Sequence, residues 1–289
     1  MRNNALRASW LATVVASVLA LASPVATSLD GVAGAGPPAA PQERPALLAD
    51  ASDPFGDAGN GHDAGVSDVD DRGTASTTDA PAPPRPAEPT GNLLVRVPRD
   101  MPVRANPGAN ASVVGTMPSD SKYYDVPVTA WVEEVSPDGR WGRVEIPYAW
   151  PRQHGWIALR GLTRRTTGVE VHIDISEHRI TVTRAGQHVL GMPAATGAAV
   201  SPTPPGEYFV TDRISFSGGS LGTFAFGISG IQPKLPPGWS GGNQLAIHGT
   251  NDPSSIGRSV SAGCLRVSER SLDLLQPLLQ LGTPVIVVP

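Results

Sequence analysis

The sequence predicts an all-β protein, with a small β-barrel followed by a β-sandwich that carries one short C-terminal helix. Three observations support this fold class. The 289 residues include 32 glycines and 30 prolines, which interrupt helices and favour turns. From about residue 92 onward, short β-prone runs alternate with Pro, Gly and Asp. Only residues 268–279 have a helical pattern, with Ser268 as the expected N-cap.

Residues 1–29 are predicted to be a signal peptide or a membrane anchor. Arg2 and Arg7 precede the apolar run Trp10–Leu21, and Ala20–Ala22 fits a cleavage site of the A-x-A type. We favour cleavage because serine, threonine and proline dilute the apolar run, and the alternative is an uncleaved anchor. In both cases the rest of the chain is expected on the extracellular side of the cytoplasmic membrane, in the cell envelope. It would contact the membrane only through an uncleaved anchor.

Residues 30–91 are predicted to be a disordered acidic linker. They contain 11 acidic side chains against three arginines, ten prolines, nine glycines and a single aromatic residue, Phe55. Such a segment cannot bury enough apolar surface to offset its conformational entropy. The net charge of −4 therefore originates in this linker. With a pI of about 5.8 it excludes a generally basic nucleic-acid-binding protein.

Residues 92–166 are predicted to form the small β-barrel, because their β-prone runs recur at short intervals. Four motifs resemble the bacterial Src-homology-type β-barrel found beside cell-wall enzymes: Pro102–Ala105, Val114–Thr116, Trp141–Val144 and Gly155–Ile157. The resemblance implies either a module that binds wall peptides or a rigid spacer, and both interpretations stay open.

Residues 168–289 are predicted to form the second β-rich domain. Val169–Ile175 and Arg179–Arg184 alternate apolar and polar residues with period two, which predicts a hairpin with one buried face. Pro284–Val288 is expected to close the chain as a strand.

The single cysteine, Cys264, excludes an internal disulfide framework. A free thiol in an exported protein is exposed to oxidation, so its presence suggests a chemical role. Ala262 and Gly263 precede it, and such small residues let a carbonyl substrate approach the backbone N–H groups beside the sulfur. Donors of this kind can form an oxyanion hole.

His248 lies sixteen residues upstream of Cys264, after an apolar run and before Gly249. A cysteine is a good nucleophile only as a thiolate, and an imidazole beside it lowers its pKa and accepts its proton. The pair alone is weak evidence, because a buried inert cysteine is the ordinary case.

The complete pattern is more specific. The strings His248–Asn251, Ser255–Gly257 and Ser261–Arg266 closely resemble the catalytic signature of bacterial L,D-transpeptidases. This resemblance covers about residues 168–289 and implies an L,D-transpeptidase-like β-sandwich. Ala262 departs from the pattern, since many members carry His there.

The resemblance also implies residue roles. Cys264 would be the nucleophile and His248 its proton partner, with the Gly249 carbonyl orienting the imidazole. The amides around Ala262, Gly263 and Cys264 would stabilise the oxyanion.

Two further residues of the signature have less definite roles. Arg266 would either bind a substrate carboxylate or brace the catalytic loop. Ser261 is expected to be structural.

By resemblance, the chain would be an enzyme that attacks the third residue of a peptidoglycan tetrapeptide stem, releases the terminal D-alanine and cross-links the third residues of two stems. Carbapenem-type β-lactams would trap the thiol, and no metal or organic cofactor is implied. The alternatives are an L,D-carboxypeptidase, an enzyme that attaches proteins to peptidoglycan, or a wall-binding module with an inactive site.

The Gly-rich segment of residues 215–242 is predicted to form a lid. It is long for a connector and contains Phe224, Phe226 and Trp239, which would offer aromatic surface to a peptide above Cys264.

Overall fold

The computed structural model describes residues 91–289, which lie in one compact unit. They form an all-β fold with one short α-helix, which confirms that part of the predicted fold class. The predicted signal peptide or anchor and all but the last residue of the predicted linker lie outside the described residues. Within residues 91–289, no helix has the length and apolar character needed to cross a membrane.

Residues 92–167, here called the first β region, form a three-stranded sheet in the order β4-β1-β8 and a five-stranded sheet in the order β3-β2-β7-β6-β5. The buried residues of this region form a largely separate core. The resemblance to Src-homology-type barrels stays a prediction. The strands are β1 (Asn92–Arg96), β2 (Met101–Arg104), β3 (Val113–Met117), β4 (Thr129–Val132), β5 (Glu134–Val135), β6 (Trp141–Glu145), β7 (His154–Ala158) and β8 (Arg164–Thr167).

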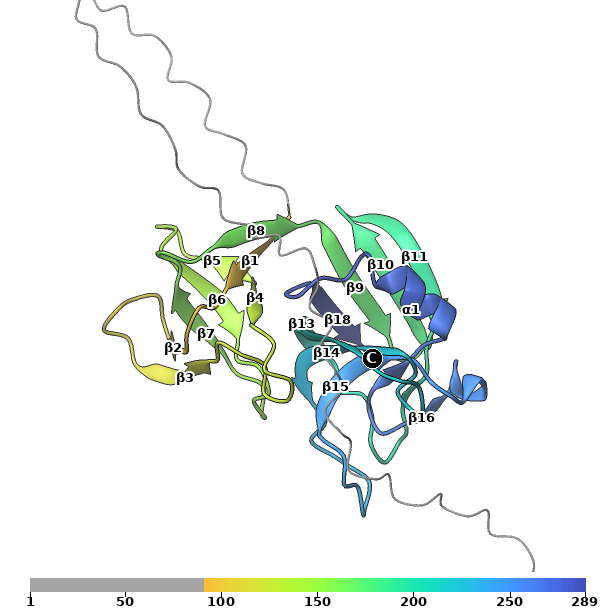
Figure 1. Cartoon of the computed structure of the whole chain (residues 1–289). Helices are drawn as coiled ribbons and strands as arrows, with labels where there is room; N and C mark the ends of the chain where they lie inside the picture. The colour runs from red at the N-terminus through yellow and green to blue at the C-terminus, as the bar shows by residue number, and fades with distance from the viewer. Residues whose placement is uncertain (1–90) are drawn as a thin grey trace, which may run out of the picture. The chain divides into compact units, whose positions relative to one another are not determined.

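Residues 168–289, here called the second β region, are built on an eight-stranded sheet in the order β11-β10-β9-β18-β13-β14-β15-β17. A short parallel pair, β12-β16, accompanies it. Figure 1 shows β13, β14 and β15 following one another across this sheet. The strands are β9 (Val169–Asp174), β10 (Arg179–Arg184), β11 (Gln187–Pro193), β12 (Thr196–Gly197), β13 (Gly206–Ser215), β14 (Phe224–Ile231), β15 (Gln244–His248), β16 (Ser259–Ser261), β17 (Leu265–Arg266) and β18 (Pro284–Val288).

The predicted hairpin is confirmed as β9 and β10, which pair antiparallel with Val171 opposite Val182. Alternate residues of β9 are buried, as the period of two predicts. The predicted final strand is β18, which runs parallel to β9 and antiparallel to β13. It therefore joins the hairpin to the strands that carry the site.

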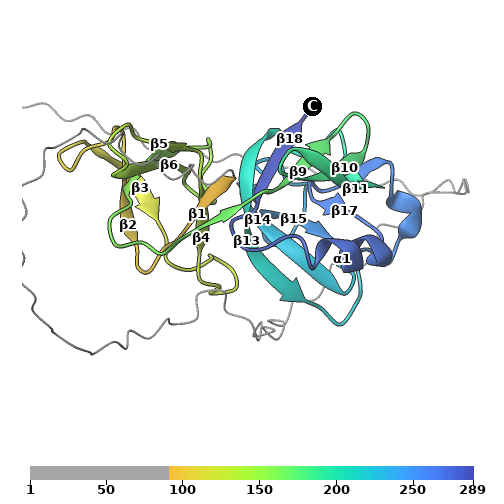
Figure 2. The same ribbon diagram turned by 90° about the horizontal axis from the view of Figure 1, so that it is seen from above.

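The predicted helix is present but shorter than expected. Helix α1 spans Glu269–Leu275, and the Ser268 side chain caps it by accepting a hydrogen bond from Ser271 N at 3.1 Å. Pro277 prevents its continuation, because proline has no N–H to donate to the preceding turn. Figure 2 shows α1 from above, beside the labels of β15 and β17.

The predicted lid of residues 215–242 is wrong for its middle part. Phe224–Ile231 is strand β14, which pairs with β13 and β15 and is buried along nearly its whole length. Phe224 and Phe226 are therefore core residues. Trp239 lies in the loop that follows β14 and is 48% exposed.

Candidate active site

The parallel pairing of β15 and β17 determines where the two main candidate residues lie. Ile247 pairs with Leu265 and His248 with Arg266, so Cys264 is level with Ala246. His248 and Cys264 are therefore diagonal neighbours on one face of the sheet. Diagonal neighbours are about 7–8 Å apart at the backbone, which an imidazole can span.

Cys264 is half-buried, and its Sγ lies 3.8 Å from the backbone carbonyl oxygen of Gln244. Burial raises the pKa of the thiol above its usual value of 9.0, while the backbone N–H of Ala246 and the charge of Arg266 act in the opposite direction. At neutral pH the resting sulfur is a thiol. Attack on a carbonyl therefore requires a base to take its proton.

His248 ends β15 and is 4% exposed. Burial is the main cause that lowers the pKa of its imidazole to about 4, with a hydrogen bond to Gly249 acting against it. Its Nδ1 lies 2.6 Å from the carbonyl oxygen of Gly249. A carbonyl only accepts, so Nδ1 carries the proton and Nε2 has its lone pair available. The neutral ring is thus in the tautomer that a general base needs.

Two carbonyl groups of the loop before β17 lie within hydrogen-bond distance of side chains from other parts of the protein. Gly263 O accepts from Thr203 Oγ1 at 2.8 Å. Ala262 O lies 3.0 Å from Ser201 Oγ, whose single proton has a closer acceptor in Lys234 O at 2.5 Å. Gln232 Nε2 adds a longer contact to Ala262 O at 3.3 Å. These bonds fix the loop that presents the sulfur.

The same bonds determine where the backbone N–H groups point. In a trans peptide the C=O and the next N–H have opposite directions. Because Gly263 O points toward Thr203, the N–H of Cys264 points to the opposite side and can face a substrate oxygen. The N–H of Gly263 is engaged instead, at 3.1 Å from Ser261 Oγ.

Gly263 has a φ of +115°, and a methyl group there would come within 2.2 Å of Gln232 Nε2. Only glycine fits both the conformation and the space. Ser261 Oγ accepts the N–H of Gly263 and donates to Cys264 O at 2.6 Å, so its hydroxyl has two bonds within the loop.

Arg266 pairs with His248 across the parallel strands and is joined to Ala195 by two backbone hydrogen bonds. Its Nε is buried and has no hydrogen-bond partner among the described residues. Whether its side chain binds a carboxylate or braces the loop stays a prediction.

Sequence reasoning missed Glu269, the first residue of α1. A methyl group on Gly249 would come within 2.2 Å of its Oε1, so the carboxylate packs directly behind the His248–Gly249 segment. Its Oε2 accepts from the backbone N of Thr223 at 3.2 Å. The first turn of a helix favours acidic residues, and this preference explains why a glutamate follows the N-cap. Nothing in the sequence linked it to His248.

It also missed the side chains that hold the loop: Ser201, Thr203 and Gln232. They come from segments thirty to sixty residues upstream, and no local pattern marks such contacts.

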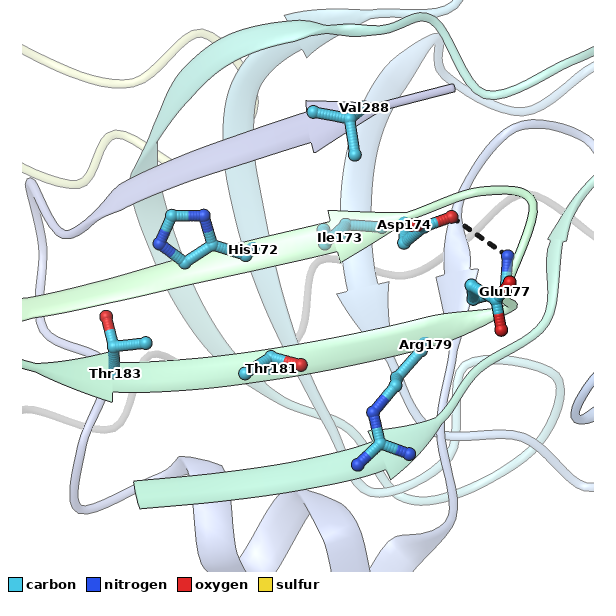
Figure 3. A pocket seen from close by; sticks show the side chains of 8 residues that line it. All are labelled: His172, Ile173, Asp174, Glu177, Arg179, Thr181, Thr183 and Val288. Carbon is cyan, nitrogen blue, oxygen red and sulfur yellow. Dashed lines mark hydrogen bonds between the residues drawn. The ribbon is translucent and has the colours of Figure 1, made fainter. Parts of the chain in front are cut away.

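A concavity away from Cys264 lies on β9, β10 and β18 and has a volume of about 450 Å³. None of the predicted site residues lines it. Asp174 Oδ1 accepts from Glu177 N at 2.9 Å at one end of it. Its lining residues, drawn in Figure 3, are His172, Ile173, Asp174, Glu177, Arg179, Thr181, Thr183 and Val288.

Comparison with known proteins places this geometry in context. Residues 168–287 match the family model of YkuD, the L,D-transpeptidase catalytic domain. A Bacillus licheniformis protein named as an L,D-transpeptidase YkuD is 29% identical over 175 residues, which cover 57% of this chain and 98% of that relative.

Solved structures are also similar. An L,D-transpeptidase from Mycobacterium tuberculosis H37Rv has 24% identity and a TM-score of 0.38, over 58% of this chain and 75% of that one. Bd1075 of Bdellovibrio bacteriovorus has 23% identity and a TM-score of 0.35, and the match covers 42% of this chain and 48% of that one. Over residues 168–287, the family match and the curated relative show that this chain is similar to the L,D-transpeptidase catalytic domain of YkuD.

Proposed function

We propose that the chain is a peptidoglycan L,D-transpeptidase in which Cys264 is the nucleophile and His248 the general base. The observation that carries this proposal is the state of His248: a neutral ring with its Nδ1 proton held by Gly249 O at 2.6 Å, on the strand beside Cys264. The family match over residues 168–287 supports it.

The first step forms an acyl-enzyme. Sγ of Cys264 rotates from the Gln244 carbonyl toward His248, gives its proton to Nε2, and attacks the carbonyl carbon of the third stem residue. The resulting oxyanion would be stabilised by the Cys264 N–H, whose direction is fixed by the Thr203 bond to Gly263 O. The bond to the terminal D-alanine then breaks, and the leaving amine takes the proton from His248. The product is a thioester.

The second step transfers the acyl group. The side-chain amine of the third residue on a neighbouring stem attacks the thioester carbonyl and gives a proton to His248 Nε2. The C–S bond breaks, and the sulfur takes that proton back. The result is a cross-link between third residues and a regenerated thiol. Carbapenem-type β-lactams would acylate the same sulfur by ring opening.

We further propose that the reaction takes place outside the cytoplasmic membrane, as the pattern of residues 1–29 suggests.

Incubation of the full chain with a disaccharide-tetrapeptide, followed by mass analysis, tests this function. We expect loss of one D-alanine per transfer and a cross-linked dimer, with neither product from Cys264→Ala. A tripeptide without dimer would favour the carboxypeptidase alternative, and a stem attached to protein would favour the attachment enzyme. An unchanged tetrapeptide would overturn an enzymatic function on this substrate.

A further inference from the structure

One row of residues crosses the face of the sheet that carries Cys264. Asp212 pairs with Gly227, and Gly227 pairs with Ala246, so these residues and Cys264 form one row across four strands. Residues of one row point to the same face. The side chains of Gln244 and Asp212 cover Gly227 in this row, because a methyl group there would come within 2.5 Å of Gln244 Nε2 and 2.6 Å of Asp212 Oδ2.

A turn of the first β region lies against this part of the second. Tyr123 Oη donates to Asn243 Oδ1 at 2.6 Å, just before β15 begins. The Tyr123 ring meets the ring of Tyr148 edge to face, with 5.9 Å between their centroids. A methyl group on Gly242 would lie 3.7 Å from Tyr123 Cε1, which is ordinary contact.

The residue after Asn243 links this turn to the nucleophile. The backbone carbonyl of Gln244 lies 3.8 Å from Cys264 Sγ. Its side chain donates to Asp212 Oδ2 at 2.6 Å and to Thr211 Oγ1 at 3.0 Å. Tyr123 therefore docks one residue away from the group that holds the thiol.

Tyr124 follows in the same turn and is half-buried. Burial, and then the charges of Asp212 and Cys264, raise the pKa of its hydroxyl. The phenol thus lies within electrostatic range of both ends of the row that Gly227 and Ala246 connect.

We propose that Tyr124, carried by the first β region, flanks Cys264 and contacts the stem peptide that donates the acyl group. The Tyr123–Asn243 hydrogen bond holds Tyr124 in this place. The first β region would then be part of the substrate site. This inference rests on the proposed function and identifies a residue that determines substrate affinity.

The chemistry of a phenol suits this ligand. The ring offers a rigid apolar surface to the methyl groups and peptide planes of a short stem, and the hydroxyl offers one hydrogen bond to its amides. Such contacts are made equally before and during the reaction, so they act on KM and leave kcat nearly unchanged.

Steady-state kinetics of the full chain on the tetrapeptide donor test the inference. For Tyr124→Ala we expect KM to rise at least about fivefold at nearly constant kcat, and for Tyr124→Phe about two- to fivefold, as loss of one hydrogen bond predicts. Tyr124→Leu keeps an apolar side chain and serves if the alanine variant does not fold. Val113→Ala, at a 56% exposed position of the first β region, is the matched control and should leave KM unchanged.

Two failures are distinguishable. If wild-type protein processes the donor and folded Tyr124→Ala and Tyr124→Leu keep its KM, the inference is overturned and the proposed function stands. If wild-type protein neither processes the donor nor forms a carbapenem adduct, the proposed function fails and the inference fails with it.

Discussion

Nδ1 of His248 lies 2.6 Å from the carbonyl oxygen of Gly249, the next residue in the chain. This bond fixes the tautomer without a carboxylate as the third group. The ring stays neutral because it is buried at the end of β15, and its Nε2 is left to accept a proton. The site therefore starts from a neutral thiol and a neutral imidazole.

The first prediction concerns the pH dependence of acylation. Since the imidazole pKa is lowered to about 4, the base stays competent well below pH 6.5, and acylation should be constant between about pH 5 and 7. It should fall about tenfold per pH unit below pH 4. His248→Gln removes the base and should slow acylation about 10²- to 10⁴-fold between pH 5 and 7. The rate of single-turnover acylation by a carbapenem, measured against pH, tests the pH dependence and the effect of His248→Gln. A decrease of the wild-type rate that begins near pH 6.5 would contradict the buried neutral ring.

The same pKa has a consequence for stability. The unfolded histidine binds a proton below pH 6.5, but the folded one does so only below about 4. As the pH is lowered from 6.5 to 4, the contribution of His248 to the free energy of unfolding should therefore decrease by up to about 3 kcal/mol. Below pH 4 this contribution should stay constant. Comparison with His248→Gln by denaturant titration isolates this contribution, since other groups titrate in both proteins.

The second prediction concerns the thiol itself. Burial raises its pKa above 9.0, so Cys264 should react slowly with iodoacetamide at pH 7, and the rate should rise about tenfold per pH unit until beyond pH 9. Alkylation followed by intact mass measures this directly. Fast, pH-independent alkylation near neutrality would indicate a resting thiolate and contradict the neutral pair.

The third prediction concerns Thr203. Its Oγ1 donates to Gly263 O at 2.8 Å and accepts from Gly197 N at 2.9 Å, both in the interior. Thr203→Val keeps the shape but leaves both groups unpaired, which costs about 1–3 kcal/mol each. Because the loop that presents Cys264 loses an anchor, acylation should slow about 10²-fold. Thr203→Ser is the matched control and should retain most activity, while a fully active, equally stable Thr203→Val would refute this role.

The fourth prediction concerns the ion pair between Glu145 and Arg152, which lies within the first β region and contacts the second through Ser229. Glu145 is 3% exposed, and its Oε1 accepts from Arg152 Nε at 2.8 Å. Ser229 Oγ donates to its other oxygen. Arg152→Met leaves the carboxylate buried without a cation, which should lower the free energy of unfolding by about 3–5 kcal/mol.

The double variant Arg152→Met, Glu145→Gln removes the unpaired charge and should recover much of that loss. Chemical denaturation of the single and double variants provides the test. If Arg152→Met is as stable as wild type, the ion pair does not contribute to the free energy of unfolding.

Sequence patterns predicted the local features of this fold well. The alternation in Val169–Ile175 gave the hairpin, and Ser268 gave the start of the helix. The strand Phe224–Ile231 lies inside the segment that the sequence predicts to be a lid. Gly-rich flanks surround it, and burial on both faces removes the alternation that marks a strand. The signature around Cys264 and His248 depends on short spacing and is visible in the sequence. The anchors of the loop, such as Thr203, are contacts between distant segments and leave no local trace.

The central claim is that Cys264 becomes acylated with His248 as its base, and intact-mass measurement after incubation with a carbapenem tests it most directly. We predict one adduct per chain, mapped to Cys264, absent from Cys264→Ala and formed at least about 10²-fold more slowly in His248→Gln. An unmodified wild-type chain, or an adduct that persists in Cys264→Ala, would contradict it.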